Sequence, residues 1–376
     1  MTKKTQEDES YCLHAVGVGR TGAGYVDGLL RTGEIEDILE DPRATFAALV
    51  ISVGRDNRGS LSAQPDRVED YAIAFRERLT SRGIPQERFS FESIVADSPE
   101  KASASAKSAI AAFTDCVQAA ELPSKVMVCF NLAGSVGIGM APEIGTQLSK
   151  SLKNIPVLGI GQLPHSGDES TKGLSKTISD LHKSAPFGGG MIIANTEHSW
   201  QRLTAYTDRN ASGSFPEIGM PSVRDRFRNQ VTSKFVQDAF MRFAVRDEGQ
   251  ALSKMLKDAD GWSYYNVSKF THPGVQVLPG EPLSKWHKVI SQWIDHLDDY
   301  SGLDSKYRSK AITVHCHGPR IIGFERMNKK LEQKLKDNYL TPNGTLHEML
   351  NYEFFDYLTA YADIFMSGVT PSDLTV

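Results

Sequence analysis

Two glycine-rich segments constrain the fold of this chain most strongly, because each follows a short apolar run and opens a helix-forming stretch. The first covers residues 17–24 and reads GVGRTGAG, at the end of the apolar run at residues 13–18. The second covers residues 133–142 and reads AGSVGIGMAP, after the apolar run at residues 126–130. A strand that turns through glycines into a helix is typical of α/β proteins with a mainly parallel sheet.

Glycine-rich turns of this kind can bind phosphate groups. Their backbone N–H groups point into one concavity, and the helix behind the turn adds the positive end of its dipole. In a parallel sheet both loops emerge at the carboxyl edge, where ligands bind. Asp97 and Ser98, followed by Pro99, start another helix on that edge. The chain contains no GxxxxGK[ST] sequence, so the phosphate site lacks a P-loop lysine.

The first half of the chain alternates apolar runs with amphipathic stretches, which predicts a Rossmann-type parallel-sheet domain. The predicted strands are residues 13–18, 46–53, 89–95, 126–130, 156–160 and 190–194. The predicted helices are residues 25–32, 99–122, the stretch after Pro142, and 168–184.

The second half differs, because residues 222–256 form one long helix-favouring segment with no proline and a single glycine, Gly249. This length exceeds that of the usual globular helix and suits a connector between domains. Beyond it we predict a smaller α/β domain with strands at 275–278, 311–317 and 357–366 and helices at 286–297 and 324–335. The expected division is a disordered lead-in at 1–11, a nucleotide-binding domain at 12–221, a central connecting helix at 222–256 and a C-terminal interaction domain at 257–376.

The composition is that of an ordinary globular protein, with 40% hydrophobic and 23% charged residues and a formal net charge of −4. This mild acidity gives no sign of nucleic-acid binding, which requires a clustered basic surface. The opening MTKKTQEDES is polar, and no apolar run approaches the roughly 20 residues of a membrane helix, so we expect a cytoplasmic protein without direct membrane binding. The four cysteines are expected to be buried thiols rather than disulfides: Cys12, Cys116, Cys129 and Cys316.

The two glycine-rich segments resemble nucleotide loops of the tubulin/FtsZ superfamily. Residues 17–30, GVGRTGAGYVDGLL, resemble the first nucleotide loop and helix of FtsZ. Residues 133–142 resemble the tubulin signature loop GGGTGSG with the Ala-Pro that follows it in FtsZ. Within the second loop, however, Ser135, Val136 and Ile138 replace Gly, Thr and Thr or Ser, so hydroxyl groups that contact phosphate in the family are missing.

Four further segments continue the resemblance in order along the chain. Residues 97–100, DSPE, resemble the Asn-Pro-Glu of the third nucleotide loop, and residues 163–168, LPHSGD, resemble the family's Lys-Pro-Phe-Ser-Phe-Glu segment near the ribose. Ala194-Asn195 resembles a Pro-Asn step whose asparagine touches guanine. Residues 310–319, KAITVHCHGP, resemble a C-terminal strand with an Asn-Ile-Thr-Gly-Gly pattern. The collinear order over about residues 12–370 indicates a divergent FtsZ-like or tubulin-like protein.

The resemblance implies a GTPase that binds GTP or GDP with Mg²⁺, assembles head to tail with itself, and converts GTP to GDP and phosphate between subunits. The loop after the central helix would place an acidic residue on the neighbouring subunit's nucleotide. The matching residues 257–261 read KDADG, which assigns Asp260 as the catalytic acid and Asp258 as its helper. An alternative alignment places this loop at residues 266–268, where no acid is present.

The expected nucleotide-contacting residues come from both glycine loops and from the matched segments. Arg20, with Thr21, stands where FtsZ has glycines and supplies a positive charge for phosphate, whereas Asp56 is the candidate for a Mg²⁺ contact. The full set is Gly17, Gly19, Arg20, Thr21, Gly22, Asp56, Asp97, Ala133, Gly134, Ser135, Val136, Gly137, Asp168, Lys172, Asn195 and Asn229. No protein metal centre is expected, because His315 and His317 share one face of a predicted strand without further ligands nearby in sequence.

Two alternatives remain open from the sequence. The altered second loop is consistent with a non-hydrolysing scaffold or binding protein of the same fold. Gly17, Gly19 and Gly22 also match the G-x-G-x-x-G dinucleotide fingerprint, which suggests an oxidoreductase with Asp56 near the end of the second strand. The oxidoreductase alternative leaves the second glycine loop and the long helix unexplained.

Overall fold

The computed structural model describes residues 11–54, 65–164, 173–196, 233–234, 236–245, 262–269, 303–318, 324–352 and 361–375. Six predicted site residues lie outside these ranges: Asp56, Asp168, Lys172, Asn229, Asp258 and Asp260. The strand predicted at 275–278 and the helix predicted at 286–297 also lie outside them. Two of the three predicted domain boundaries fall there too, at 221–222 and 256–257, and stay predictions.

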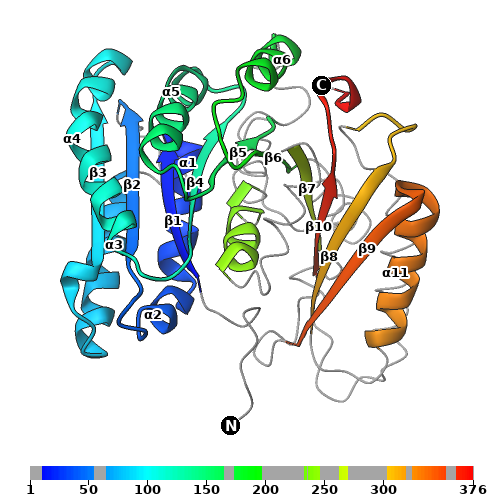
Figure 1. Ribbon diagram of the computed structural model, residues 1–376, viewed down its shortest axis with the longest axis horizontal. Helices are drawn as coiled ribbons and strands as arrows, with labels where there is room; N and C mark the ends of the chain where they lie inside the picture. Colours follow the sequence, from blue (N-terminus) through cyan, green and yellow to red (C-terminus); the bar gives the residue numbers. More distant parts are fainter. Residues whose placement is uncertain are drawn as a thin grey trace, which may run out of the picture.

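One sheet of ten strands runs through the described chain (Figure 1). In order across the sheet, its strands are β3 (Phe89–Ala96), β2 (Phe46–Val53), β1 (Cys12–Val18), β4 (Ser124–Asn131), β5 (Val157–Gln162), β6 (Met191–Asn195), β7 (Trp262–Lys269), β10 (Tyr361–Ser367), β8 (Ser309–Gly318) and β9 (Leu340–Tyr352). The strands from β3 to β7 are parallel, β10 is antiparallel to both β7 and β8, and β8 is parallel to β9. The predicted α/β class with a mainly parallel sheet is confirmed.

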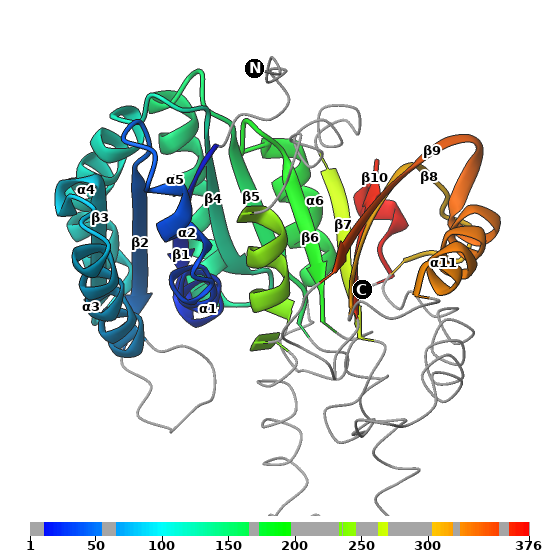
Figure 2. The same cartoon turned by 90° about the horizontal axis from the view of Figure 1, so that it is seen from below.

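Helices cover both faces of the sheet (Figures 1 and 2). One face carries α1 (Gly19–Arg31), α2 (Glu34–Ile38), α3 (Pro65–Ser81) and residues 233–234 and 236–245, here called the central helical segment. The other face carries α4 (Pro99–Gln118), α5 (Ser135–Ser151), α6 (Leu174–Ser184) and α11 (Phe324–Tyr339). Short 3₁₀ turns lie at Gln86–Arg88 and Pro371–Asp373. In the described ranges no helix is both long and apolar enough to cross a membrane.

The core forms two apolar layers because successive residues of each strand face opposite sides of the sheet. In β1, Leu13 and Ala15 belong to one layer, whereas Val16 and Val18 belong to the other. Strands buried on both faces require continuous apolar runs, which is why these segments were recognisable in the sequence. The strand order 3-2-1-4-5-6 is that of doubly wound nucleotide-binding sheets, and it reverses between β1 and β4.

Several boundaries differ from the sequence predictions. Helix α1 begins at Gly19 rather than at residue 25, and α5 begins at Ser135, so much of each glycine segment forms the first turn of a helix. Strands β7 and β9 and helix α3 were not predicted. Residues 266–268, where the alternative alignment expects the catalytic loop, lie within β7 and pair with β10.

Three of the four cysteines are free thiols, as expected: Cys12, Cys116 and Cys129. Cys12 and Cys129 are buried in the sheet and Cys116 is half-buried. Burial raises the pKa of all three thiols, which keeps them protonated at neutral pH and disfavours their chemical reaction.

Candidate anion-binding site

Two helix N-termini meet at the carboxyl edge of the sheet, at the point where the strand order reverses. Helix α1 follows β1 with Val18 as its N-cap, and α5 follows β4 with Gly134 as its N-cap. Neither cap residue bonds the first turn through a side chain. A Cβ placed on Gly19 would lie 3.7 Å from Val136 Cγ1 and 4.0 Å from the Gly137 nitrogen, so the two first turns touch.

Backbone contacts explain why glycines occupy this turn. A Cβ on Gly17 would lie 2.5 Å from the carbonyl carbon of Gly22. A Cβ on Gly22 would lie 2.2 Å from the Cys129 carbonyl oxygen on β4. Gly19 has a φ of +71°, a conformation that other residues rarely adopt. These three glycines therefore let α1 begin directly against β1 and β4.

Asn131, at the end of β4, joins the two turns. Its side-chain oxygen accepts a hydrogen bond from the Ala133 N–H at 2.7 Å, and its Nδ2 donates to Thr21 Oγ1 at 3.4 Å. A Cβ on Gly137 would lie 2.9 Å from the Asn131 carbonyl oxygen, so the first turn of α5 packs on the same residue. The sequence predictions missed Asn131, although a polar residue that ends an apolar strand just before a glycine loop is a usable signal.

The central helical segment, which lies on the other face of the sheet from α5, also contacts the first turn of α1. Gln237 Nε2 donates to the Thr21 carbonyl oxygen at 3.5 Å and to Gln162 Oε1 at 3.2 Å. Gln162, at the end of β5, donates in turn to Ser233 Oγ at 3.1 Å. Gln162 and Gln237 are both buried. Neither glutamine was predicted as a site residue.

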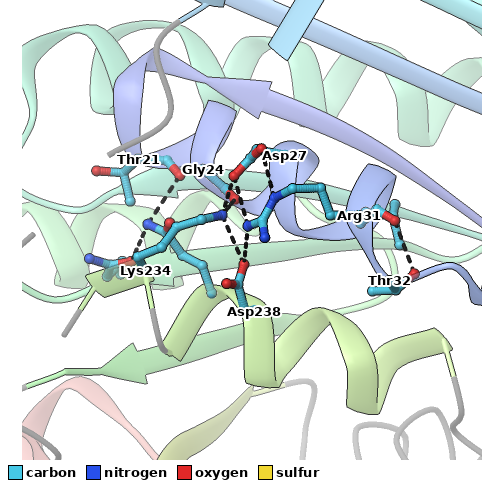
Figure 3. A network of polar contacts seen from close by, with 10 residues as sticks. Thr21, Gly24, Asp27, Arg31, Thr32, Lys234 and Asp238 are labelled. Carbon is cyan, nitrogen blue, oxygen red and sulfur yellow. Dashed lines mark hydrogen bonds and ion pairs between the residues drawn. The ribbon is translucent and has the colours of Figure 1, made fainter. Parts of the chain in front are cut away.

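A network of charges fastens α1 to the central helical segment (Figure 3). Arg31 donates to both carboxylate oxygens of Asp27 at 3.0 Å and pairs with Asp238 at 2.9 Å. Lys234 pairs with Asp27, pairs with Asp238 at 2.8 Å, and donates to the Gly24 carbonyl oxygen at 3.3 Å. Two cations thus balance two carboxylates, which satisfies the buried Asp27.

The side chains of the two turns differ in exposure. Arg20 and Ser135 are exposed, Thr21 is half-buried, and Val136 and Ile138 are half-buried against the core beneath α5. The first turn of α5 therefore presents apolar groups at positions 136 and 138, and its contacts to an anion must come from backbone N–H groups and Ser135.

Two predicted residues lie elsewhere along the same edge. Asp97 is exposed and pairs with Lys101 at 3.0 Å, while Ser98 Oγ caps α4 by accepting from the Lys101 N–H at 3.4 Å. Asn195 is buried at the end of β6 and donates to the Tyr264 hydroxyl at 2.5 Å. The structure thus brings together the residues of the two glycine turns and separates them from Asp97 by β2 and from Asn195 by β5.

This geometry suits an anion with several oxygen atoms. Helix N-termini carry unpaired N–H groups and partial positive charge, and two such ends that touch add their fields at one point. Phosphate groups fit this arrangement. Within the described ranges no group of three or more His, Cys, Asp or Glu could hold a metal ion, so Mg²⁺ stays a prediction.

No protein-family model and no curated protein matches the sequence of this chain. Solved structures do match its fold. A mutant FtsZ from M. jannaschii superimposes with a TM-score of 0.54 at 14% identity, over 97% of this chain and 95% of that one. A GDP-bound monomer of CetZ1 from Haloferax volcanii gives a TM-score of 0.53 at 13% identity, over 95% of this chain and 93% of that one. GDP-form protofilaments of TubZ from Bacillus thuringiensis serovar israelensis give a TM-score of 0.54 at 11% identity, over 97% of this chain and 86% of that one.

These similarities extend over nearly the whole chain and are not limited to the part that contains strands β1–β6. At such low identity they establish the fold. The tubulin/FtsZ resemblance predicted from six collinear segments is therefore confirmed at that level: this chain has the fold of FtsZ, CetZ1 and TubZ.

Proposed function

We propose that this protein binds guanine nucleotide at the paired helix N-termini, assembles head to tail into filaments, and hydrolyses GTP between subunits. The observation that carries the proposal is the contact between the first turns of α1 and α5 where the strand order reverses. The fold supports it further, since CetZ1 of the same fold is GDP-bound and TubZ forms protofilaments.

The phosphate groups would lie against the N–H groups of Gly19, Arg20 and Thr21 on one side and those of Ser135–Gly137 on the other. Arg20 is exposed next to this position and would add positive charge. The proposed ribose and base contacts are Asp168, Lys172, Asn195 and Asn229. Asp97 and Asp56 would complete the site. Asp56 would contact Mg²⁺, and this ion offsets the negative charge of the phosphate groups when it is bound.

Hydrolysis would be completed by Asp260 of the next subunit, with Asp258 beside it, orienting the attacking water. Replacing Asp260 with Ala is expected to leave GTP affinity unchanged and to lower turnover at least a hundredfold, because the carboxylate acts on water rather than on bound nucleotide. Equilibrium binding and steady-state phosphate release separate the two effects. Asp304, an exposed acid near β8, provides a control whose replacement leaves turnover unchanged. Equal turnover in Asp260→Ala and the parent protein would refute the assignment.

The function as a whole is tested by phosphate release from GTP across a range of protein concentrations, with light scattering recorded in parallel and ATP as a control. If the active site forms between subunits, the rate per subunit rises with concentration and follows the scattering. A rate per subunit that is constant with concentration would contradict hydrolysis between subunits.

A second candidate function, a non-hydrolysing scaffold that still self-associates, is favoured by one observation. Val136 and Ile138 place apolar side chains in the first turn of α5, where they pack against the core. This turn offers fewer hydroxyl contacts to a terminal phosphate. Assembly that requires GTP or GDP but releases no phosphate would support this candidate over the first.

A further inference from the structure

We infer that Gln237 is a positioning residue for the anion-binding turn of α1, an inference that rests on the proposed function of that turn. Gln237 belongs to the central helical segment, 216 residues away from Thr21 in sequence. It does not lie in either glycine turn. It acts through the Thr21 backbone, which belongs to the first turn of α1.

The side-chain amide of Gln237 lies directly on α1. A Cβ on Gly24 would lie only 2.1 Å from Gln237 Oε1, so the amide occupies the space left by that glycine. The Nε2 group donates to the Thr21 carbonyl oxygen and to Gln162 Oε1. Gln237 as a whole residue is 2% exposed, which removes water as a competing partner. The contact thus sets the distance between the central helical segment and the first turn of α1.

The same contact extends to the second glycine turn. The Thr21 carbonyl oxygen accepts a hydrogen bond from Gln237, and the Thr21 hydroxyl accepts one from the Asn131 side-chain nitrogen. The side-chain oxygen of Asn131 in turn accepts a hydrogen bond from the Ala133 N–H. A continuous chain of hydrogen bonds therefore runs from the central helical segment through Thr21 to the loop before α5. Fixing Thr21 fixes the directions of the N–H groups in both first turns relative to one another.

The two polar atoms of the Gln237 amide differ in their contacts, and the difference indicates that this position requires a hydrogen-bond donor. Gln237 Oε1 is buried and has no hydrogen-bond partner among the described residues. An acceptor buried without a partner is destabilising by about 1–3 kcal/mol, a cost that a methionine or leucine of similar size would avoid. The amide is consistent with selection for its N–H groups, which hold Thr21 and Gln162.

The test compares three variants of the full chain. Gln237→Met keeps the volume and removes the donor, and Gln237→Glu replaces the donor with a carboxylate that donates only when protonated. Gln118→Met is the matched control, because it makes the same replacement in α4, on the other face of the sheet, where Gln118 Nε2 donates to the Ser151 carbonyl oxygen at 3.3 Å. Titration calorimetry with GTP and GDP measures affinity, and amide hydrogen exchange without nucleotide measures protection at residues 19–25.

We expect Gln237→Met to bind both nucleotides about tenfold more weakly, as the loss of one buried hydrogen bond implies, and to exchange faster at residues 19–25. Gln118→Met should change neither quantity. The affinity of Gln237→Glu relative to the parent protein should be lowest near pH 8 and recover toward pH 5, as the carboxyl group gains a proton and can donate again. A role in stability alone would lower the unfolding temperature without this pH-dependent ratio.

The two proposals fail in different ways. If the parent protein binds neither GTP nor GDP, the proposed function fails, while the exchange measurement still tests the positioning role. If Gln237→Met shows unchanged exchange at residues 19–25, the positioning role is overturned, whether or not nucleotide binds. If exchange rises but affinity for a bound nucleotide is unchanged, the turn is ordered by Gln237 without consequence for the anion, which also overturns the inference.

Discussion

At the scale of single residues, glycines show how closely two helices and two strands approach at the proposed site. Gly17 and Gly22 pack directly against each other, and Gly22 also packs against the Cys129 carbonyl group, with no room for a side chain at either position. Both belong to a short pattern that also occurs in unrelated loops, so the sequence alone predicted a phosphate-binding loop without revealing the tight packing behind it.

Replacing Gly22 with Ala should destabilise the protein by about 3 kcal/mol, because the added methyl group meets the Cys129 carbonyl oxygen, which cannot move aside. Gly139→Ala is the matched control. Gly139 is an exposed position within α5 where a Cβ has nothing within 4 Å, so the change should stabilise by up to about 1 kcal/mol. Urea denaturation of both variants measures the difference. Equal stability of the two variants would contradict the packing of β1, α1 and β4.

His14 makes the fold sensitive to acid. Its ring is buried in β1, Nδ1 accepts from the Ala47 N–H at 3.0 Å, and Nε2 lies 3.4 Å from Ser124 Oγ. Burial lowers the pKa of His14 from 6.5 to about 3. Between these two pH values the unfolded chain binds one more proton than the folded chain, so acid favours unfolding.

The free energy of unfolding should therefore fall by about 1.4 kcal/mol for each pH unit below about 6.5 from this group alone, and stop falling from it near pH 3. His14→Asn keeps an acceptor for the Ala47 N–H and should reduce the slope by one proton. Urea denaturation between about pH 7 and pH 5 measures this slope. An identical slope in His14→Asn would rule out the neutral buried ring as its cause.

Among the candidate site residues, those in the two glycine turns could be predicted because their pattern is local. Asn131 was within reach of the same reasoning, since it directly precedes the second loop. Gln162 and Gln237 could not be predicted, because the hydrogen bond between them joins segments that are 75 residues apart in the chain. No periodicity or spacing in a single sequence encodes such a contact.

At the scale of elements, the ion network between α1 and the central helical segment is the part that substitution can test most directly. Asp27→Ala leaves Arg31 and Lys234 with one carboxylate between them at a partly buried place, and should destabilise by about 3–5 kcal/mol. Asp238→Ala removes a more exposed partner, with 34% of its side chain accessible, and should cost at most about 1 kcal/mol. Thermal unfolding of the two variants side by side checks the order, and similar losses would contradict it.

The predictability of elements followed their periodicity. Strands β1 to β4 are apolar runs bounded by glycine or polar residues, and their observed limits differ from the predicted ones by at most two residues. Helix α3 was missed although Val68, Ala72, Phe75 and Leu79 repeat at helical spacing and are buried, so its signal was present. Strand β9 contains Pro342 and Gly344, which weaken any strand prediction.

At the scale of the whole molecule, the fold was predictable because six segments in order carried more information than any one of them. The pairing of β6 with β7, through which the parallel strands β1–β6 continue into the C-terminal strands, was not predictable. That pairing depends on β7, whose sequence WSYYNVSK mixes aromatic and polar residues and has no clear alternation. It places the strands of both halves of the chain in one hydrogen-bonded sheet.

The position of β10 between β7 and β8 has a consequence for biosynthesis. A ribosome makes β7, β8 and β9 before β10, yet in the described part of the sheet β8 and β9 connect to the other strands only through β10. During translation the β8–β9 pair must therefore wait, with one strand edge open, until residues 361–367 have emerged. Chains held on the ribosome by a C-terminal linker long enough to bring residue 352 out of the exit tunnel should show protease protection of β1–β6 but not of β8 and β9, whereas protection of all of them at that length would contradict this order of assembly.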